Sequence, residues 1–296
     1  MSRPQLPEPQ SFDRVLSSMC TRPAPAAERA AREFLATNPG DPATFESVAA
    51  VESSVVSSLG EIAGLADPHG YVTAGGTEAN VQAVRAARNR SSVDEPNVVA
   101  PDSAHFSLRK AAELLDVPVR FVDTDSNHRA DPAAMAAAAD ENTVLFFCVA
   151  GSTEYGRVDP IPAIADRAES VGAACHVDAA FGGFLLPFTD REWHFGHAGV
   201  DTMTIDPHKT GRAAIPAGGF LAREEATLEA LQVETPYLAS ETQVSLGGTR
   251  SGAGVASAAA AIEALWPAGY RAAFDRTTEL ASWVASELES RGYAVT

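Results

Sequence analysis

The sequence contains almost no lysine. Its 22 basic residues include only two lysines, Lys110 and Lys209, against 39 acidic residues, and the formal net charge is −17. Such an excess of carboxylates repels nucleic acid and anionic membranes, so neither is an expected partner. Because arginine can replace lysine as a surface charge but not as an amine nucleophile, a lysine at an informative position is a candidate for chemistry.

Cysteines and long apolar segments are also scarce. The three cysteines, Cys20, Cys148 and Cys175, have neither the number nor the spacing of a disulfide framework or a zinc site. Cys148 and Cys175 lie in apolar runs, which predicts small buried side chains. No apolar run reaches the roughly 18 residues of a membrane span, and residues 1–10 (MSRPQLPEPQ) lack the apolar centre of a signal peptide. These absences indicate a cytoplasmic protein.

The acidic, lysine-poor composition has two explanations. It is similar to that of proteins from salt-loving archaea, in which high salt screens the repulsion between surface carboxylates. A GC-rich genome, whose codons favour arginine and alanine, would give a similar composition. We favour the halophilic explanation.

Short apolar runs alternate with helical stretches from about residue 64 onward. This alternation predicts an α/β fold with a mostly parallel seven-stranded sheet flanked by helices. The expected strands are residues 70–73, 97–100, 119–122, 143–150, 173–177, 201–205 and 218–222, and the expected helices between them are residues 77–89, 103–115, 132–139 and 160–171. The last strand follows its predecessor without a helix, so it is expected to run antiparallel, because a parallel pairing needs a longer crossover.

Three parts of the chain are expected. Residues 1–63 form an N-terminal helical segment, and residues 64–250 form a large α/β domain. Residues 251–296 contain two helical stretches and then the letters GYAVT, which look like the first residues of a strand. We therefore expect this last part to be a connecting helix and the start of a truncated small C-terminal domain.

Residues suited to catalysis follow several of the expected strands. In an open parallel sheet, ligands bind outside the carboxyl ends of the strands. Lys209 follows the sixth strand, Asp178 ends the fifth, and His105 follows the second. The segment GGTEAN, at residues 75–80 after the first strand, can present free N–H groups at a helix N-terminus to a phosphate. Three of these have a plain structural alternative: Asp178 could cap a turn, His105 could be structural, and GGTEAN could be a tight turn before an ordinary N-cap.

Together these residues match the needs of pyridoxal 5'-phosphate (PLP). Its phosphate favours a helix N-terminus, its pyridine nitrogen a carboxylate, and its aldehyde a lysine amine. The sequence resembles the group II PLP-dependent decarboxylases and, within them, the archaeal tyrosine/aspartate decarboxylase branch. The resemblance rests on GGTEAN (75–80), HVDAAFGG (176–183) and DPHK (206–209), and for the archaeal branch on SMCT (18–21), NPGDP (38–42) and GTRSG (248–252).

The resemblance implies a role for each candidate residue. Lys209 would bind the PLP aldehyde covalently, Asp178 would pair with the pyridine nitrogen, and His105 would stack on the ring and help to return a proton to the substrate. Contacts to the cofactor are also implied for Gly76, Thr77, His208 and Thr153. The implied fold is the aspartate-aminotransferase type of PLP-dependent transferase, working as a homodimer with its sites at the subunit interface.

The implied reaction is the decarboxylation of a small L-amino acid. A salt-loving archaeon needs β-alanine for coenzyme A, which favours L-aspartate over L-tyrosine and L-glutamate. Arg250 is a candidate for binding a substrate carboxylate, but it could equally hold a subunit contact. Two features depart from the family: the small C-terminal domain is nearly absent, and Thr210 stands where a methionine is usual. The first departure leaves a non-catalytic PLP-binding remnant as an alternative.

A metal-dependent hydrolase is an alternative from another class. His176 and Asp178 could form a metal site with His208, or with His194 and His197. This spacing fits no zinc pattern well, so we favour the PLP interpretation.

Overall fold

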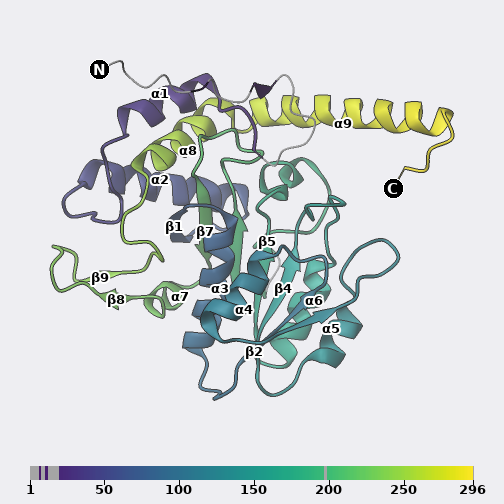
Figure 1. Cartoon of the computed structure of the whole chain (residues 1–296), viewed down its shortest axis with the longest axis horizontal. Coiled ribbons are helices and arrows are strands. Elements are labelled where there is room, and N and C mark those ends of the chain that lie inside the picture. The colour runs from purple at the N-terminus through teal and green to yellow at the C-terminus, as the bar shows by residue number, and fades with distance from the viewer. Residues whose placement is uncertain (1–6, 8–10, 13–19, 197–198, 296) are drawn as a thin grey trace.

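A seven-stranded sheet forms the centre of the molecule, with helices on both sides (Figure 1). The computed structural model of the chain describes residues 7, 11–12, 20–196 and 199–295. The strand order is β1-β7-β6-β5-β4-β2-β3. The strands are β1 (His69–Thr73), β2 (Asn97–Pro101), β3 (Val119–Val122), β4 (Thr143–Val149), β5 (Ala174–Asp178), β6 (Thr202–Ile205) and β7 (Gly218–Ala222). The predicted α/β class is confirmed, and each expected strand occurs within about one residue of its predicted bounds.

The last strand, β7, runs antiparallel to both of its neighbours. It pairs with β1 on one side and β6 on the other, so that Ala222 lies opposite both His69 and Thr202. The other pairings in the sheet are parallel. This confirms the predicted reversal, because the connection from β6 to β7 contains no crossover helix.

Two apolar layers cover the sheet, and the central strand β4 contributes to both. Successive side chains of a strand point to opposite faces. Leu145 and Phe147 pack with residues of two helices on one face, and Phe146 and Cys148 pack with the larger cluster on the other. The predicted burial of Cys148 and Cys175 is confirmed.

The helices are α1 (Pro25–Glu33), α2 (Glu46–Ile62), α3 (Gly76–Arg90), α4 (Ser107–Leu115), α5 (Pro132–Ala138), α6 (Ile161–Ser170), α7 (Glu225–Glu229), α8 (Gly252–Leu265) and α9 (Ala268–Ser290).

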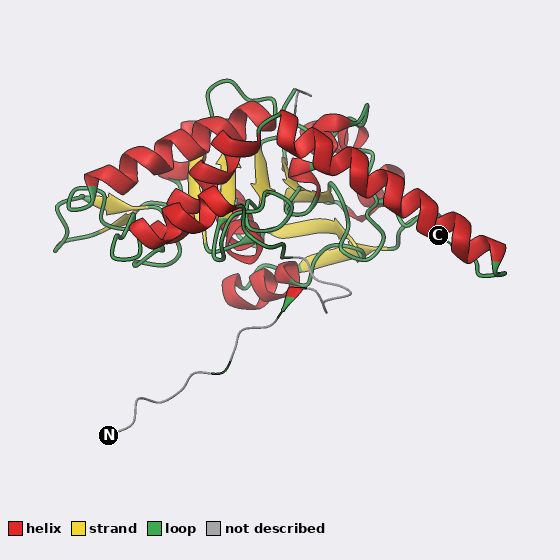
Figure 2. Cartoon of the chain, turned by 90° about the horizontal axis from the view of Figure 1, so that it is seen from above, coloured by secondary structure: helices red, strands yellow, loops and turns green. Residues whose placement is uncertain are grey.

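The two ends of the described chain share one layer. Helix α8 packs against α1 and α2, and α9 then extends beyond the body of the molecule (Figures 1 and 2). Residues 293–295 form no strand, which differs from the expected start of a strand at this point. A separate small ladder joins β8 (Val233–Glu234) to β9 (Thr242–Gln243). Among the described residues, no helix combines the length and the apolar character that crossing a bilayer requires.

Candidate functional site

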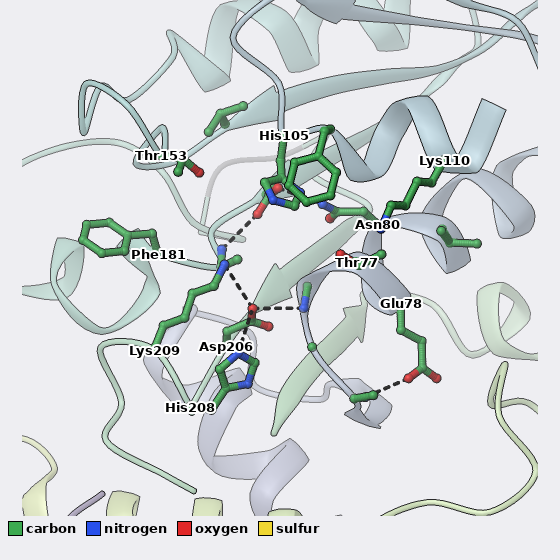
Figure 3. Close-up of a pocket in the computed structure, with 18 of the residues that line it drawn as sticks. Thr77, Glu78, Asn80, His105, Lys110, Thr153, Phe181, Asp206, His208 and Lys209 are labelled. Atoms are coloured by element: carbon green, nitrogen blue, oxygen red, sulfur yellow. Dashed lines mark hydrogen bonds and ion pairs between the residues drawn. The ribbon is translucent and has the colours of Figure 1, made fainter. Parts of the chain in front are cut away.

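A cavity of about 520 Å3 opens beside the N-terminus of α3, at the carboxyl ends of the parallel strands (Figure 3). Its volume lies within the range of small-molecule sites. The cavity is lined by all the residues expected to contact PLP: Gly76, Thr77, His105, Thr153, Asp178, His208 and Lys209. The structure therefore brings together residues that the sequence distributes over the ends of five strands.

Lys209 lies in a turn after β6 that directs its amine toward this cavity (Figure 3). Its backbone N–H donates to the carbonyl of Asp206 (3.0 Å), and its Nζ lies 3.3 Å from the Asp206 Oδ2. The Thr21 hydroxyl donates to the Lys209 carbonyl (2.6 Å), which holds the turn from the N-terminal part of the chain. Ser18 and Met19, of the same SMCT segment, lie outside the described residues.

Asp178, the last residue of β5, accepts hydrogen bonds from two N–H donors. Asn80 Nδ2 donates to its Oδ2 (2.8 Å), and the backbone N–H of Ala180 donates to its Oδ1 (3.0 Å). Asn80 is itself fixed, because its Nδ2 also donates to the Ser107 hydroxyl (2.9 Å) and its Oδ1 accepts from the Thr204 hydroxyl (2.7 Å). The carboxylate of Asp178 is thereby held in one orientation at the cavity wall.

The N-terminus of α3 is built to approach a ligand closely. Gly75 has φ = 148°, a conformation that other residues rarely adopt, and a Cβ there would lie 3.1 Å from the His208 Cε1. The Gly76 N–H donates to the Asp206 Oδ2 (2.9 Å). Within the described ranges, the N–H and hydroxyl of Thr77 have no hydrogen-bond partner, so they are available to an anion.

Glu78 does not compete for this anion site. Its carboxylate accepts hydrogen bonds from the Ala74 N–H (2.7 Å) and from the Tyr71 hydroxyl (2.9 Å). Figure 3 shows the side chain directed away from Lys209 and Asp206. The carboxylate at the first turn of α3 is therefore already hydrogen-bonded to these two donors.

The ring of His105 is in contact with Phe106, with 4.1 Å between the ring centroids. Its Nδ1 accepts a hydrogen bond from the Ser107 N–H (3.2 Å), which places any proton of the neutral ring on Nε2. Burial lowers the pKa of His105; the Asp178 carboxylate opposes this shift, and the Lys209 ammonium adds to it. We therefore expect a neutral imidazole near pH 7.

His208 is oriented by a carbonyl on the next strand connection. Its Nδ1 lies 2.6 Å from the Ala217 carbonyl oxygen and 3.2 Å from the Ala217 backbone nitrogen, so the backbone of Ala217 fixes this edge of the ring. The Nε2 atom then points toward the Asp206 Oδ2, 3.9 Å away. One edge of the ring is thus fixed, and the other faces the anion site.

Arg250 is not part of the cavity. Its guanidinium pairs with both carboxylate oxygens of Glu52 and donates to the carbonyls of Pro39 (2.8 Å) and Val72 (3.0 Å). The side chain is only 10% exposed. Within one chain, this arginine joins α2, β1 and the loop before α8.

Three cavity residues were not assigned a site role from the sequence. Asp206 and Asn80 belong to the DPHK and GGTEAN segments, but no pattern in the sequence shows that they face Lys209 and Asp178. Lys110 lies at the cavity rim with its Nζ 5.0 Å from the centre of the Phe106 ring. A signal was available for Lys110, since it is one of only two lysines in the chain.

The alternative metal site is not assembled in the described part of the chain. The ring nitrogens of His176 contact the hydroxyl of Thr202 (2.8 Å) and the Oδ1 of Asn80 (3.1 Å). His194 Nδ1 accepts the N–H of Gly196 (2.9 Å), and His197 lies outside the described residues. Among the residues described, no three His, Cys, Asp or Glu side chains are grouped as metal ligands.

The cavity fits a flat phosphorylated aldehyde. The amine of Lys209 can meet an aldehyde, and Asp178 offers a fixed carboxylate to a ring nitrogen. Thr77 offers an unpaired N–H and hydroxyl to a phosphate, and His105 offers a flat ring.

Comparison with known proteins also indicates a pyridoxal-dependent enzyme. Residues 41–291 match the family described as "Pyridoxal-dependent decarboxylase conserved domain". A "Probable L-aspartate decarboxylase" of Haloarcula marismortui is 62% identical over 291 residues, which cover 98% of this chain and 83% of that protein. A "Probable L-tyrosine/L-aspartate decarboxylase" of Methanothrix thermoacetophila is 47% identical, over 95% of this chain and 74% of that protein. The glutamate decarboxylase structure of Lactobacillus brevis shares the fold, with a TM-score of 0.83 at 20% identity, over 99% of this chain and 76% of that one.

Proposed function

This chain belongs to the pyridoxal-dependent decarboxylase family, and we propose that the amino acid it decarboxylates is L-aspartate, giving β-alanine and carbon dioxide. Relatives at 62% and 63% identity carry the name "Probable L-aspartate decarboxylase", which supports this substrate. The name "Probable L-tyrosine/L-aspartate decarboxylase", borne by a relative at 47% identity, makes L-tyrosine the alternative, with L-glutamate behind it. β-Alanine made in this way would supply coenzyme A synthesis.

One observation carries the proposal: the Lys209 amine shares a cavity with the Asp178 carboxylate and the N-terminus of α3. PLP, when bound, supplies a ring that accepts the electrons of the bond broken at the substrate α-carbon. We assign to Lys209 the binding of its aldehyde, and to Asp178 the retention of a proton on its pyridine nitrogen.

The remaining cavity residues have supporting roles in the proposal. Gly76, Thr77 and His208 hold the phosphate, since they line the α3 end of the cavity. Thr153 lies beside the ring. His105 stacks on the ring as a neutral imidazole, and its Nε2 proton can be given to the α-carbon after carbon dioxide leaves.

We also infer that the protein is a cytoplasmic homodimer. Large apolar side chains are exposed around the rim of the cavity, including Phe106 (57% exposed) and Leu114 (70% exposed). A second copy that covered them would shield the cavity from water. The acidic surface favours a halophilic host.

The test compares the two lysines of the chain. Purified protein in high salt is incubated with PLP, reduced with borohydride and digested, and the modified peptide is identified by mass spectrometry. The label is expected on the peptide of Lys209, to be lost in Lys209→Arg and to be retained in the matched control Lys110→Arg. A coloured adduct that survives Lys209→Ala would contradict the assignment.

Amine release from L-aspartate, L-tyrosine and L-glutamate then identifies the substrate. Preference for L-aspartate supports the proposal, and preference for either other acid replaces it. Cofactor binding without turnover of any of the three would favour a non-catalytic PLP-binding protein.

A further inference from the structure

We propose that Asp206 couples cofactor binding to proton uptake: the carboxyl group must be protonated for a phosphate to be held at the N-terminus of α3. The inference rests on the proposed PLP site and adds a positioning residue that the PLP assignment does not include. It also predicts a pH dependence of cofactor affinity that a single substitution removes.

Asp206 lies at the base of the cavity, and its side chain is 0% exposed. Its Oδ2 accepts the Gly76 N–H (2.9 Å) and faces the Lys209 Nζ (3.3 Å) and the His208 Nε2 (3.9 Å). Its Oδ1 is buried and has no hydrogen-bond partner among the described residues. A fully buried carboxylate thus has one oxygen in contact with the anion site and one oxygen unsatisfied.

The surroundings leave this carboxyl group little room to turn away. A Cβ placed on Gly218 would lie 2.8 Å from the Asp206 Oδ1 and 2.5 Å from the Gly75 Cα. A Cβ on Gly76 would lie 2.9 Å from the Asp206 Oδ2. The backbone of α3 and of β7 therefore encloses the carboxyl group. A change in its protonation state requires less rearrangement of the surrounding atoms than a change in its position.

Charged and titratable groups surround Asp206 on several sides. Lys209 and His208 face it from its own loop, Asp178 adds a negative charge from β5, and the Cys20 thiol interacts with it from the N-terminal part of the chain. From α3 it meets a neutral N–H, and β7 presents the backbone of Gly218. Burial raises the pKa of Asp206, while Lys209 and then His208 oppose this shift.

Binding of PLP would add an anion to these surroundings. Its phosphate would bring a charge of about −1.5 to −2 near neutral pH. An ionised carboxylate would then face a second anion and would hold the Gly76 N–H that the phosphate needs. A protonated carboxyl group avoids the repulsion and can donate a hydrogen bond to a phosphate oxygen.

A simpler role for Asp206, as a counter-ion of Lys209, predicts a different result. In that case the ratio of the wild-type PLP dissociation constant to that of Asp206→Asn would not rise with pH. Under the proposal, the dissociation constant of the wild type rises relative to that of Asp206→Asn as pH increases, by up to about tenfold per pH unit. The ionisation of PLP itself is the same for both proteins and cancels in their ratio.

The experiment measures PLP dissociation constants by equilibrium dialysis in high salt, from about pH 6 to about pH 9. Asp206→Asn is expected to bind PLP at least about tenfold more tightly than the wild type at the alkaline end. The matched control is Asp201→Asn, because Asp201 is a mostly buried carboxylate at the opposite end of β6, where it accepts the Cys175 N–H (2.7 Å). This control should follow the wild-type curve. A ratio of the wild-type to the Asp206→Asn dissociation constant that stays constant or falls as pH rises overturns the proposal.

Calorimetry on the wild type alone gives a second measurement if the variant does not fold. Heats of PLP binding in buffers of different ionisation enthalpy report the protons taken up. Pyridoxal, which lacks the phosphate, should take up fewer protons than PLP, after the titration of the PLP phosphate itself is subtracted. Equal uptake for both ligands overturns the proposal. Failure of the wild type to bind PLP at any pH would instead contradict the proposed function.

Discussion

Buried residues behind the cavity wall have fixed roles as hydrogen-bond donors and acceptors. Because His176 Nδ1 contacts the Thr202 hydroxyl and its Nε2 contacts the Asn80 Oδ1, the neutral ring donates from Nε2 and accepts at Nδ1. This leaves the Asn80 amide group free to donate to Asp178. A buried neutral histidine therefore helps to orient the carboxylate that the cofactor requires.

The same histidine gives a pH-dependent contribution to stability. Burial lowers the pKa of His176 to about 4, from an ordinary value of 6.5. Its contribution is fully present above about pH 6.5 and is lost as pH falls toward and through about 4, because the unfolded chain binds the proton first. The free energy of unfolding of the wild type, relative to His176→Gln, is expected to fall by up to about 3 kcal/mol over this interval. Denaturant unfolding at a series of pH values checks this, and a constant difference between the two proteins would contradict it.

The sequence was sufficient to predict those cavity residues whose place in the cavity follows from their position at the end of a strand. Lys209 and Asp178 end up together because the carboxyl ends of β6 and β5 lie at one edge of the sheet. Asn80 could not be assigned in this way, since its contact with Asp178 depends on how α3 rotates against β5. The pairing of Arg250 with Glu52 could not be predicted for a related reason: the two residues lie far apart in the chain, and only tertiary packing joins them.

At the scale of elements, the cavity depends on the close approach of β7 to the turn before α3. A Cβ on Gly218 would lie 2.4 Å from the Thr73 Oγ1, in addition to its close contact with Gly75. Gly218→Ala is therefore expected to lower the free energy of unfolding by about 1–3 kcal/mol and to weaken PLP binding, because the start of α3 must shift. Denaturant unfolding and equilibrium dialysis measure the two effects.

A matched glycine controls for the loss of flexibility alone. The nearest neighbour of a Cβ on Gly248 would be the Gln243 Oε1, at 3.8 Å, which is an ordinary contact. Gly248→Ala should leave PLP binding unchanged. If both substitutions had the same effect on PLP affinity, the close approach at Gly218 would not be the cause.

Element types were easier to predict than their ends. The antiparallel direction of β7 followed from the short connection before it. Helix α4 begins at Ser107 rather than near residue 103, because His105 and Phe106 form the turn that carries the histidine to the cavity. A turn of this kind has no hydrophobic periodicity of its own, so sequence patterns assign it to the following helix.

At the scale of the whole molecule, the net charge of −17 is the dominant feature. Screening lengths shorten from about 10 Å at 0.1 M salt to about 3 Å at 1 M, so repulsion between surface carboxylates weakens as salt is added. The melting temperature is expected to rise by roughly 5 °C or more between these concentrations of KCl. Sucrose at matched osmolality is the control, because it adds no screening ions. An equal rise in sucrose would argue against a charge effect.

The strand order has a consequence for the synthesis of the protein. Within the described sheet, β1 pairs with β7 alone, although β1 is among the first strands to leave the ribosome and β7 is the last of the seven. The nascent chain therefore carries β1 as an unpaired edge, open to wrong partners, until residues 218–222 emerge. Formation of the cavity would be limited by the same event, because the strand that completes the sheet also lies against the turn before α3 that lines the cavity.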